Sequence, residues 1–230
     1  MPAPERYVEW INAHLGFDPR SQANSNALSE FIVDDLCASS PKLERLIQSD
    51  KLSPLKNASV STSVTVRNVD LVLYEKQSLP NLSVRLSVEH KSVMTAHGKA
   101  RLNKYEDIIA YCNHMHNHRR ECVVGATVVI NTSALSENPE AFAGGLTRPK
   151  LKMEKVVGDT FKIFTGIPLR ESPDDPNDQP EALTVIVVEY DGVNPASLVT
   201  SDLARLASSQ AYYDNFIERL AAKYENRFGA

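Results

Sequence analysis

Two acids and a lysine in one stretch of the chain are the residues whose types and spacing most clearly suggest chemistry. Glu89 and Lys91 lie two residues apart within the run from Val84 to Val93, whose composition predicts a β-strand. Side chains two positions apart in a strand point to the same face. Asp70 lies on the preceding predicted strand, from Val69 to Tyr74. Two carboxylates on adjacent strands can hold a hard divalent cation, and a lysine beside them can orient an attacking water or stabilise transition-state charge.

The motif formed by Asp70, 18 intervening residues and then Glu89-His90-Lys91 resembles the signature of the PD-(D/E)XK nuclease superfamily, which includes many restriction endonucleases. Its context adds to the resemblance, because the acid lies early in one predicted strand, E-x-K lies within the next, and a helical pattern follows. The chain departs from the family at one point, since Val69 rather than a proline precedes Asp70. The alternative interpretation is a solvated strand face, where carboxylates and lysines are common.

This resemblance implies an α/β fold, a restriction-endonuclease-like sandwich with a central mixed β-sheet flanked by helices. It also implies a Mg²⁺-dependent DNA endonuclease of the restriction (type II) kind, with Mn²⁺ as an alternative cofactor, and a homodimer if both strands of a duplex are cut. Asp70 and Glu89 would bind the metal, the carbonyl of His90 would add a ligand, and Lys91 would position the nucleophilic water. Family members often carry a glutamate on the helix before the first strand, so Glu30 is a candidate metal ligand, with a solvent-facing acid as the alternative.

A basic helix is predicted immediately after the E-x-K strand, beginning near Gly98. Arg101 belongs to the apolar stripe of this helix, where its guanidinium could face a bound phosphate or its stem could cover the core while its head reaches water. Lys99 and Lys104 lie elsewhere on the helix and are expected to contact the backbone of a nucleic acid.

A second basic segment lies in an insertion at about 132–182, which is too long to be a plain connection. Its first half carries Lys150 and Lys152, which we expect to contact DNA, although a charged surface hairpin is the alternative. Its second half, with the sequence ESPDDPNDQPE, is acidic and rich in proline, which predicts a mobile loop.

Length and composition indicate one soluble domain of 230 residues, with 42% hydrophobic and 23% charged content. The 25 Lys and Arg residues against 29 Asp and Glu residues give a net charge of −4, which argues against a wholesale polyanion binder. A nucleic-acid surface must therefore be a local basic patch. Three cysteines and no long apolar run predict a reduced, cytoplasmic protein that does not enter a membrane.

Other functions fit parts of the same sequence. One is a catalytically inactive nuclease fold that serves as a DNA-binding or interaction module, and another is a structure-specific nuclease. A third is a zinc-stabilised structural protein, because five candidate ligands occur close together. The pattern contains no CxxC knuckle, and histidines also suit the negative end of a helix dipole. The five residues are Cys112, His114, His116, His118 and Cys122.

Periodicity predicts the remaining elements of the fold. Pro54 is expected to break the chain before a strand that alternates valine with hydroxyl residues. Two later runs are apolar on both faces, which is typical of a covered parallel pair. The expected segments are a helix from Ser25, a helix at Lys42–Gln48, strands at Ser59–Arg67, Cys122–Ile130 and Leu183–Val188, and a helix at Ser201–Phe228.

Overall fold

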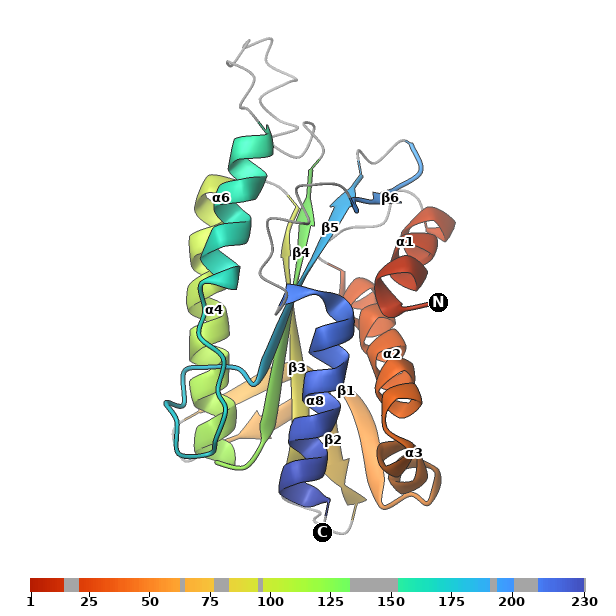
Figure 1. The fold of residues 1–230 in the computed structure, drawn as a ribbon, viewed down its shortest axis with the longest axis vertical. Helices are drawn as coiled ribbons and strands as arrows, with labels where there is room; N and C mark the ends of the chain where they lie inside the picture. The colour runs from red at the N-terminus through yellow and green to blue at the C-terminus, as the bar shows by residue number, and fades with distance from the viewer. Residues whose placement is uncertain are drawn as a thin grey trace.

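The computed structural model of the chain describes residues 1–14, 21–62, 65–76, 83–94, 97–132, 153–190, 194–200 and 211–229. Within these residues the fold is α/β, with one six-stranded mixed sheet and six helices (Figure 1). The strands are β1 (Leu52–Ser61), β2 (Val66–Glu75), β3 (Ser83–Val93), β4 (Val123–Asn131), β5 (Ala182–Glu189) and β6 (Ser197–Leu198). The helices are α1 (Ala3–Ala13), α2 (Gln22–Ser39), α3 (Pro41–Gln48), α4 (His97–His118), α6 (Met153–Thr165) and α8 (Tyr213–Phe228).

The sheet keeps its strands in chain order, from β1 at one edge to β6 at the other. The first three strands form an antiparallel meander, whereas β3, β4 and β5 are parallel to one another and β6 returns antiparallel. All nine residues of β4 are buried, as expected for a strand covered on both faces. The predicted mixed sheet and its central parallel pair are therefore confirmed.

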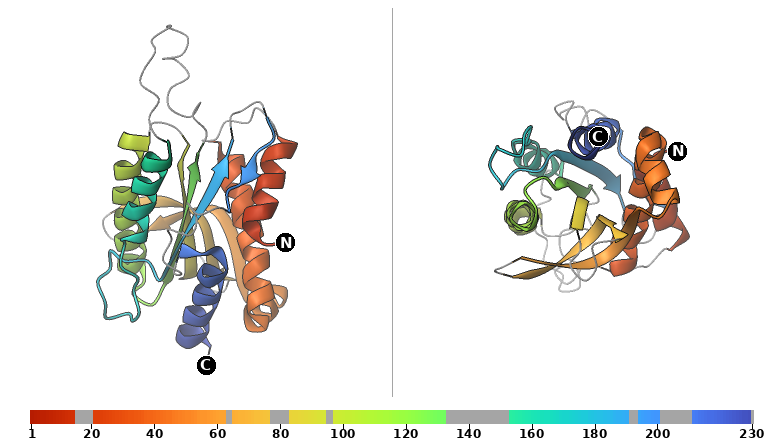
Figure 2. Two further views of the ribbon diagram at one scale, coloured as in Figure 1. Left: turned by 45° about the horizontal axis from the view of Figure 1, so that its top comes forward. Right: turned by 90° about the horizontal axis from the view of Figure 1, so that it is seen from below.

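Helices cover both faces of the sheet and bury two separate cores (Figure 2). Residues of α1, α2, α3 and α8 pack on one face, and residues of α4 and α6 pack on the other. The approach of α8 is close, because a Cβ added at Gly125 of β4 would lie 3.2 Å from side-chain atoms of Leu220 and Phe216. None of the described helices is long and apolar enough to span a membrane.

The first hairpin corrects two predictions about strand boundaries. The predicted strand Ser59–Arg67 is wrong, because β1 ends at Ser61 and β2 begins at Val66. The N–H of Thr62 donates to the carbonyl of Thr65 across the turn. Pro54 does not break the chain but lies inside β1, which tolerates a proline because it is an edge strand.

The helix predictions are correct in position and less exact at their ends. The helix expected from Ser25 begins at Gln22, and the one expected at Lys42–Gln48 begins one residue earlier, at Pro41. The hydroxyl of Ser40 accepts the N–H of Leu43, which caps this helix. Of the helix expected at the C-terminus, α8 supplies 213–228, and 201–210 lie outside the described residues.

Candidate active site

Two of the predicted site acids lie where β2 and β3 separate. The antiparallel pairing of these strands ends at Leu71 and Val88, so Asp70 and Glu89 are the first residues beyond it. The Oδ2 atom of Asp70 accepts the backbone N–H of His90 at 2.8 Å. This bond holds the Asp70 carboxylate beside the Glu89–His90 segment of β3.

A local irregularity in β1 accompanies this separation. Asn57 has a φ of 53°, in the left-handed region that asparagine tolerates better than most residues. The β1–β2 pairs Lys56–Leu71 and Ala58–Val69 flank it, so Asn57 lies opposite Asp70. The regular ladder is thus interrupted on both sides of Asp70.

Glu89 is buried, with an exposed fraction of 4%, and its two carboxylate oxygens have different surroundings. The Oε1 atom accepts from Nζ of Lys91 at 2.6 Å and from a terminal nitrogen of Arg67 at 3.4 Å. The Oε2 atom is buried and has no hydrogen-bond partner among the described residues. Leaving a buried charged oxygen unpaired costs free energy, which a bound cation would offset.

Helix α4 adds further charges to this pair. The Oδ2 atom of Asp107 lies 3.9 Å from Nζ of Lys91 and 3.5 Å from Nζ of Lys104. Arg67 also donates to the backbone carbonyl of Asp107, at 3.3 Å. Sequence reasoning identified Lys104 but missed Arg67, which reaches Glu89 from the neighbouring strand β2, and Asp107, which the packing of α4 brings to Lys91 and Arg67.

His90 supports the site through its ring. Its Nε2 atom lies 2.9 Å from the hydroxyl of Ser29 on α2, and its Nδ1 atom lies 2.7 Å from the hydroxyl of Thr127 on β4. Ser29 also donates to the carbonyl of Asp70, at 3.4 Å. Burial lowers the pKa of His90 to about 4, so the ring is neutral near pH 7 and joins α2, β3 and β4 as a hydrogen-bonded strut.

Glu30 is not brought together with the other predicted ligands by any contact of the described structure. Its side chain is exposed and forms an ion pair with Lys56 of β1. The preceding residue, Ser29, is the part of α2 that contacts Asp70 and His90. In the structure, Glu30 is thus a solvent-facing acid.

Among the residues predicted to contact DNA, those that the structure describes have different surroundings. Arg101 is partly buried and lies 3.8 Å from the carboxylate of Asp159 on α6. Lys99 is exposed near the start of α4, and Lys104 lies beside Asp107. Lys150 and Lys152 lie outside the described residues.

The histidines of the candidate zinc cluster point to separate partners. The ring nitrogens of His114 and His118 bond the backbone carbonyls of Val60 and Ser61. His116 instead bonds the carbonyl of Asn177 and the carboxylate of Glu181. Across the described ranges no group of three or more His, Cys, Asp or Glu residues could hold a metal ion, and these ranges include all five candidates.

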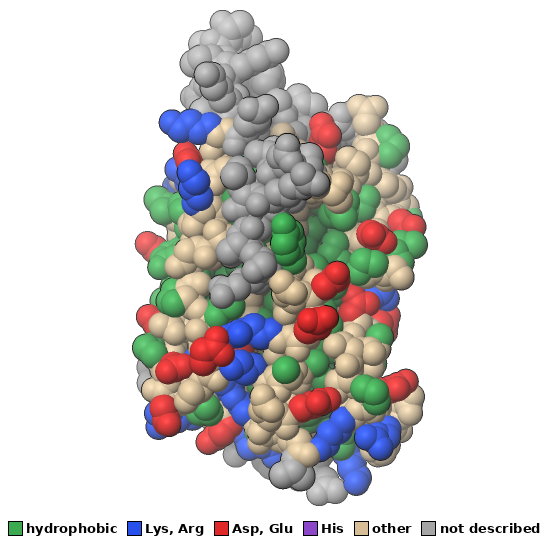
Figure 3. All heavy atoms as spheres, in the orientation of Figure 1, with side chains coloured by type: hydrophobic (Ala, Val, Ile, Leu, Met, Phe, Trp, Pro, Cys, Tyr) green, Lys and Arg blue, Asp and Glu red, His purple; other side chains and the backbone are tan. Residues whose placement is uncertain are grey.

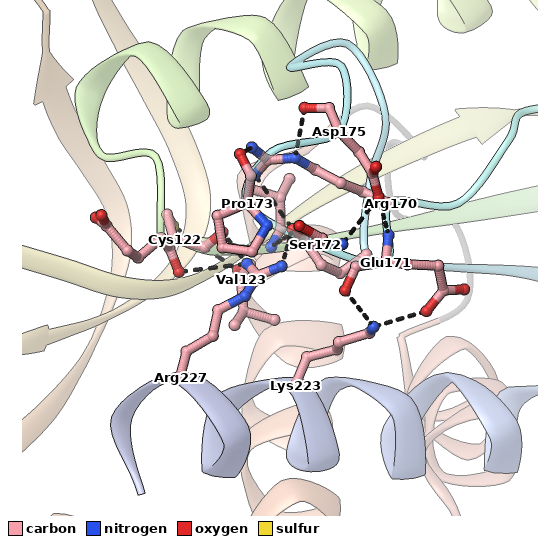
Figure 4. Close-up of polar contacts among 12 residues, drawn as sticks. Cys122, Val123, Arg170, Glu171, Ser172, Pro173, Asp175, Lys223 and Arg227 are labelled. Carbon is pink, nitrogen blue, oxygen red and sulfur yellow. Dashed lines mark hydrogen bonds and ion pairs between the residues drawn. The ribbon is translucent and has the colours of Figure 1, made fainter. Parts of the chain in front are cut away.

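A dense buried polar network, which sequence reasoning also missed, lies where β4 and β5 begin. The acidic loop at 171–181 was predicted to be mobile, whereas the structure gives it many hydrogen bonds (Figure 4). The loop encloses the guanidinium of Arg170, which is fully buried. Lys223 and Arg227 reach toward this region from α8. Arg170 donates to the carbonyls of Arg120, Pro173 and Asp175 and to the side chains of Asn177 and Glu181.

Glu181 is the carboxylate at the centre of this network. Its Oε1 atom lies 3.4 Å from Arg170 and 2.7 Å from Arg227. Its Oε2 atom accepts the N–H of Val124 at 2.8 Å and lies 3.2 Å from His116. Burial raises the pKa of Glu181, but the bond from His116 and the nearby Arg227 outweigh it, so the pKa falls below its usual value.

Comparisons with protein-family models, curated proteins and solved structures gave no significant match. Function must therefore be argued from the site. Asp70 and Glu89 supply carboxylate oxygens, which suit a hard divalent cation better than a soft one. The unpaired Oε2 atom of Glu89 is the observation that fits a bound ion.

Proposed function

We propose that this protein is a Mg²⁺-dependent nuclease that hydrolyses DNA phosphodiester bonds where β2 and β3 separate. The observation that carries the proposal is the state of Glu89. It is buried, one carboxylate oxygen is bonded by Lys91 and Arg67, and the other has no partner among the described residues. Asp70 is held next to it by the backbone of His90. The pairing of two strand carboxylates with a lysine supports hydrolysis of a phosphate ester.

Each protein group has a separate role in this proposal. When bound, Mg²⁺ or Mn²⁺ supplies Lewis-acid polarisation of the phosphoryl group and lowers the pKa of a water. Asp70 and Glu89 would hold the ion, with the carbonyl of His90 as a further ligand. Lys91 would orient the attacking water or donate to a phosphoryl oxygen, which places positive charge where negative charge develops.

The choice of DNA, of restriction-like cutting and of a homodimer rests on the resemblance to PD-(D/E)XK nucleases. Figure 3 shows acidic and basic side chains interspersed over one face of the described chain, in agreement with the net charge of −4. Lys99, Arg101, Lys104, Lys150 and Lys152 would then contact the phosphates of the DNA backbone.

Incubation of the purified protein with supercoiled plasmid, with and without Mg²⁺, tests this function. We expect nicked or linear DNA with Mg²⁺ or Mn²⁺, and intact plasmid with EDTA. The substitution Glu89→Gln should remove cleavage, because it removes a metal-binding charge. Glu30→Gln is the matched control and should retain cleavage, since Glu30 is exposed and paired with Lys56. Intact plasmid with both metals, from protein whose circular dichroism shows a folded α/β chain, would refute the proposal.

A further inference from the structure

Arg67 lies on β2, three residues before Asp70, and combines two long hydrogen bonds with a partly exposed side chain. Its terminal nitrogen lies 3.4 Å from Oε1 of Glu89 and 3.3 Å from the carbonyl of Asp107. Charge-assisted hydrogen bonds are commonly about 2.7–2.9 Å long. The side chain remains 25% exposed, and its guanidinium lies over the ring of Tyr111 at 5.7 Å. Arg67 thus lies at the site, but its hydrogen bonds there are long and its side chain remains partly exposed.

Arg85 shows how this chain holds a structural arginine. It lies on β3, with 18% of its side chain exposed, and forms a close ion pair with Glu75. Its guanidinium lies 4.5 Å from the centroid of the Phe228 ring. Both arginines therefore combine a carboxylate with an aromatic face, but the contacts of Arg85 are closer. The difference indicates that Arg67 has exchangeable contacts.

The position of Arg67 also affects any cation that binds Glu89. Lys91 and Arg67 share Oε1 of Glu89, so two positive charges adjoin this carboxylate in the free protein. A divalent ion bound at Glu89 would be repelled by both. Lys91 lies closer to the carboxylate than Arg67 does, with its Nζ atom 2.6 Å from Oε1 of Glu89. Arg67 is consequently the cation that can leave at the smaller cost.

We propose that Arg67 binds the substrate phosphate and that, in the free protein, it is held on Glu89. This inference rests on the proposed function for its substrate, a phosphodiester of DNA. A guanidinium presents a planar fork of donors that matches phosphate oxygens. When Arg67 moves to the phosphate, Oε1 of Glu89 loses a competing cation. DNA and the divalent ion then bind with positive coupling, and each increases the affinity for the other.

The test compares wild type with Arg67→Gln and with the matched control Arg85→Gln. Calorimetry with Mn²⁺ and no DNA measures the ion affinity. Arg67→Gln should bind Mn²⁺ about fivefold more tightly, because it removes one positive charge that would repel a divalent ion bound at Glu89. Arg85→Gln should match wild type. Equal Mn²⁺ affinity in wild type and Arg67→Gln, weaker affinity in the variant, or no binding by either would overturn the proposal.

A second measurement follows duplex DNA binding in Ca²⁺ by fluorescence anisotropy across a series of salt concentrations. Loss of one phosphate contact should weaken DNA binding and reduce the slope of log affinity against log salt by about 1. Arg85→Gln should keep the wild-type slope, and an unchanged slope in Arg67→Gln would also overturn the proposal. If Arg67→Gln fails to fold, Arg67→Lys replaces it, because this substitution keeps the positive charge. Arg67→Lys should retain the wild-type Mn²⁺ affinity and salt slope. A change in either quantity would overturn the proposal.

These results separate the two proposals. Tighter Mn²⁺ binding and a lower salt slope in Arg67→Gln, without Mg²⁺-dependent cleavage by wild type, would uphold the role of Arg67 and refute the nuclease. Mg²⁺-dependent cleavage by wild type, with unchanged Mn²⁺ affinity and salt slope in Arg67→Gln, would uphold the nuclease and refute the role of Arg67.

Discussion

Two buried glutamates of this fold, one within β3 and one next to the start of β5, have opposite surroundings. Glu181, immediately before β5, has partners on both oxygens, from Arg170, Arg227, His116 and the N–H of Val124. Glu89, in β3, has partners among the described residues on one oxygen only. A fully bonded carboxylate in a low-dielectric interior fixes the structure around it, whereas a half-bonded one retains capacity for a ligand. The comparison separates the part of the molecule built for stability from the part suited to chemistry.

The largest expected effect on stability comes from removing the charge of the fully bonded glutamate. Glu181→Gln leaves Arg170 and Arg227 without their shared carboxylate, and breaking such a buried pair costs about 3–5 kcal/mol. Urea denaturation at neutral pH measures this loss. Glu171→Gln is the control on the same loop, because its acid is 64% exposed, and it should cost less than about 1 kcal/mol.

The stability loss in Glu181→Gln should depend on pH. The pKa of Glu181 is lowered in the folded state, so its stabilising effect is present above its usual value of 4.5 and is lost as the pH falls through the lower folded-state pKa. The stability gap between wild type and Glu181→Gln should therefore narrow in acid. A gap that stays constant or widens would show that the charge of Glu181 is not the stabilising feature.

The corresponding change at the half-bonded glutamate should have a smaller effect on folding. Glu89→Gln is expected to change the free energy of unfolding by about 1 kcal/mol or less, because relieving the buried Oε2 atom, which has no partner among the described residues, offsets the lost ion pairs with Lys91 and Arg67. Asp107 remains near Lys91 as a second acceptor. Urea denaturation again provides the measurement. A loss as large as that of Glu181→Gln would mean that both glutamates are primarily structural.

A similarly small effect on stability is expected at the histidines near the end of α4. His114→Gln removes one bond to the carbonyl of Val60, worth about 1 kcal/mol at ~pH 8. Burial lowers the pKa of His114, so the fold favours the neutral ring and wild type loses stability as the pH falls below the usual value of 6.5. The difference between wild type and variant should thus be smaller at ~pH 5 than at ~pH 8.

Metal analysis extends this prediction to the zinc hypothesis. His114→Gln and His118→Gln together should leave folding and plasmid cleavage near normal, since both rings bond backbone carbonyls. Stoichiometric zinc in purified wild type, lost in the double variant together with the fold, would establish a structural zinc site instead.

Features set by local periodicity could be predicted from the sequence. The two-residue spacing of Glu89 and Lys91 predicted that their side chains meet, and the doubly apolar runs predicted β4 and β5. The hairpin turn at 62–65 was missed because serine, threonine and valine alternate without a break from Ser59 to Val66. A period of two continues through such a turn, so the pattern carries no signal of it.

Features set by distant contacts could not be predicted. Arg67 and Asp107 are 40 residues apart and meet only because α4 packs on the sheet. The loop around Arg170 has the composition of a mobile segment, and only the burial of that guanidinium explains its hydrogen bonds. Amino-acid composition indicates how much conformational entropy a segment loses when it becomes ordered. It does not show that one buried arginine can supply the hydrogen-bond donors that hold the segment in place.

Single-turnover cleavage of duplex DNA by wild type and Lys91→Ala tests the central claim most directly. Lys91 is proposed to act on the water and the transition state, so its loss should lower the Mg²⁺-dependent rate by about 10²–10⁴-fold. DNA affinity in Ca²⁺ should stay close to the wild-type value, and circular dichroism should show a folded chain. An unchanged cleavage rate in a folded, DNA-binding Lys91→Ala protein would contradict the assignment of this site as the catalytic centre.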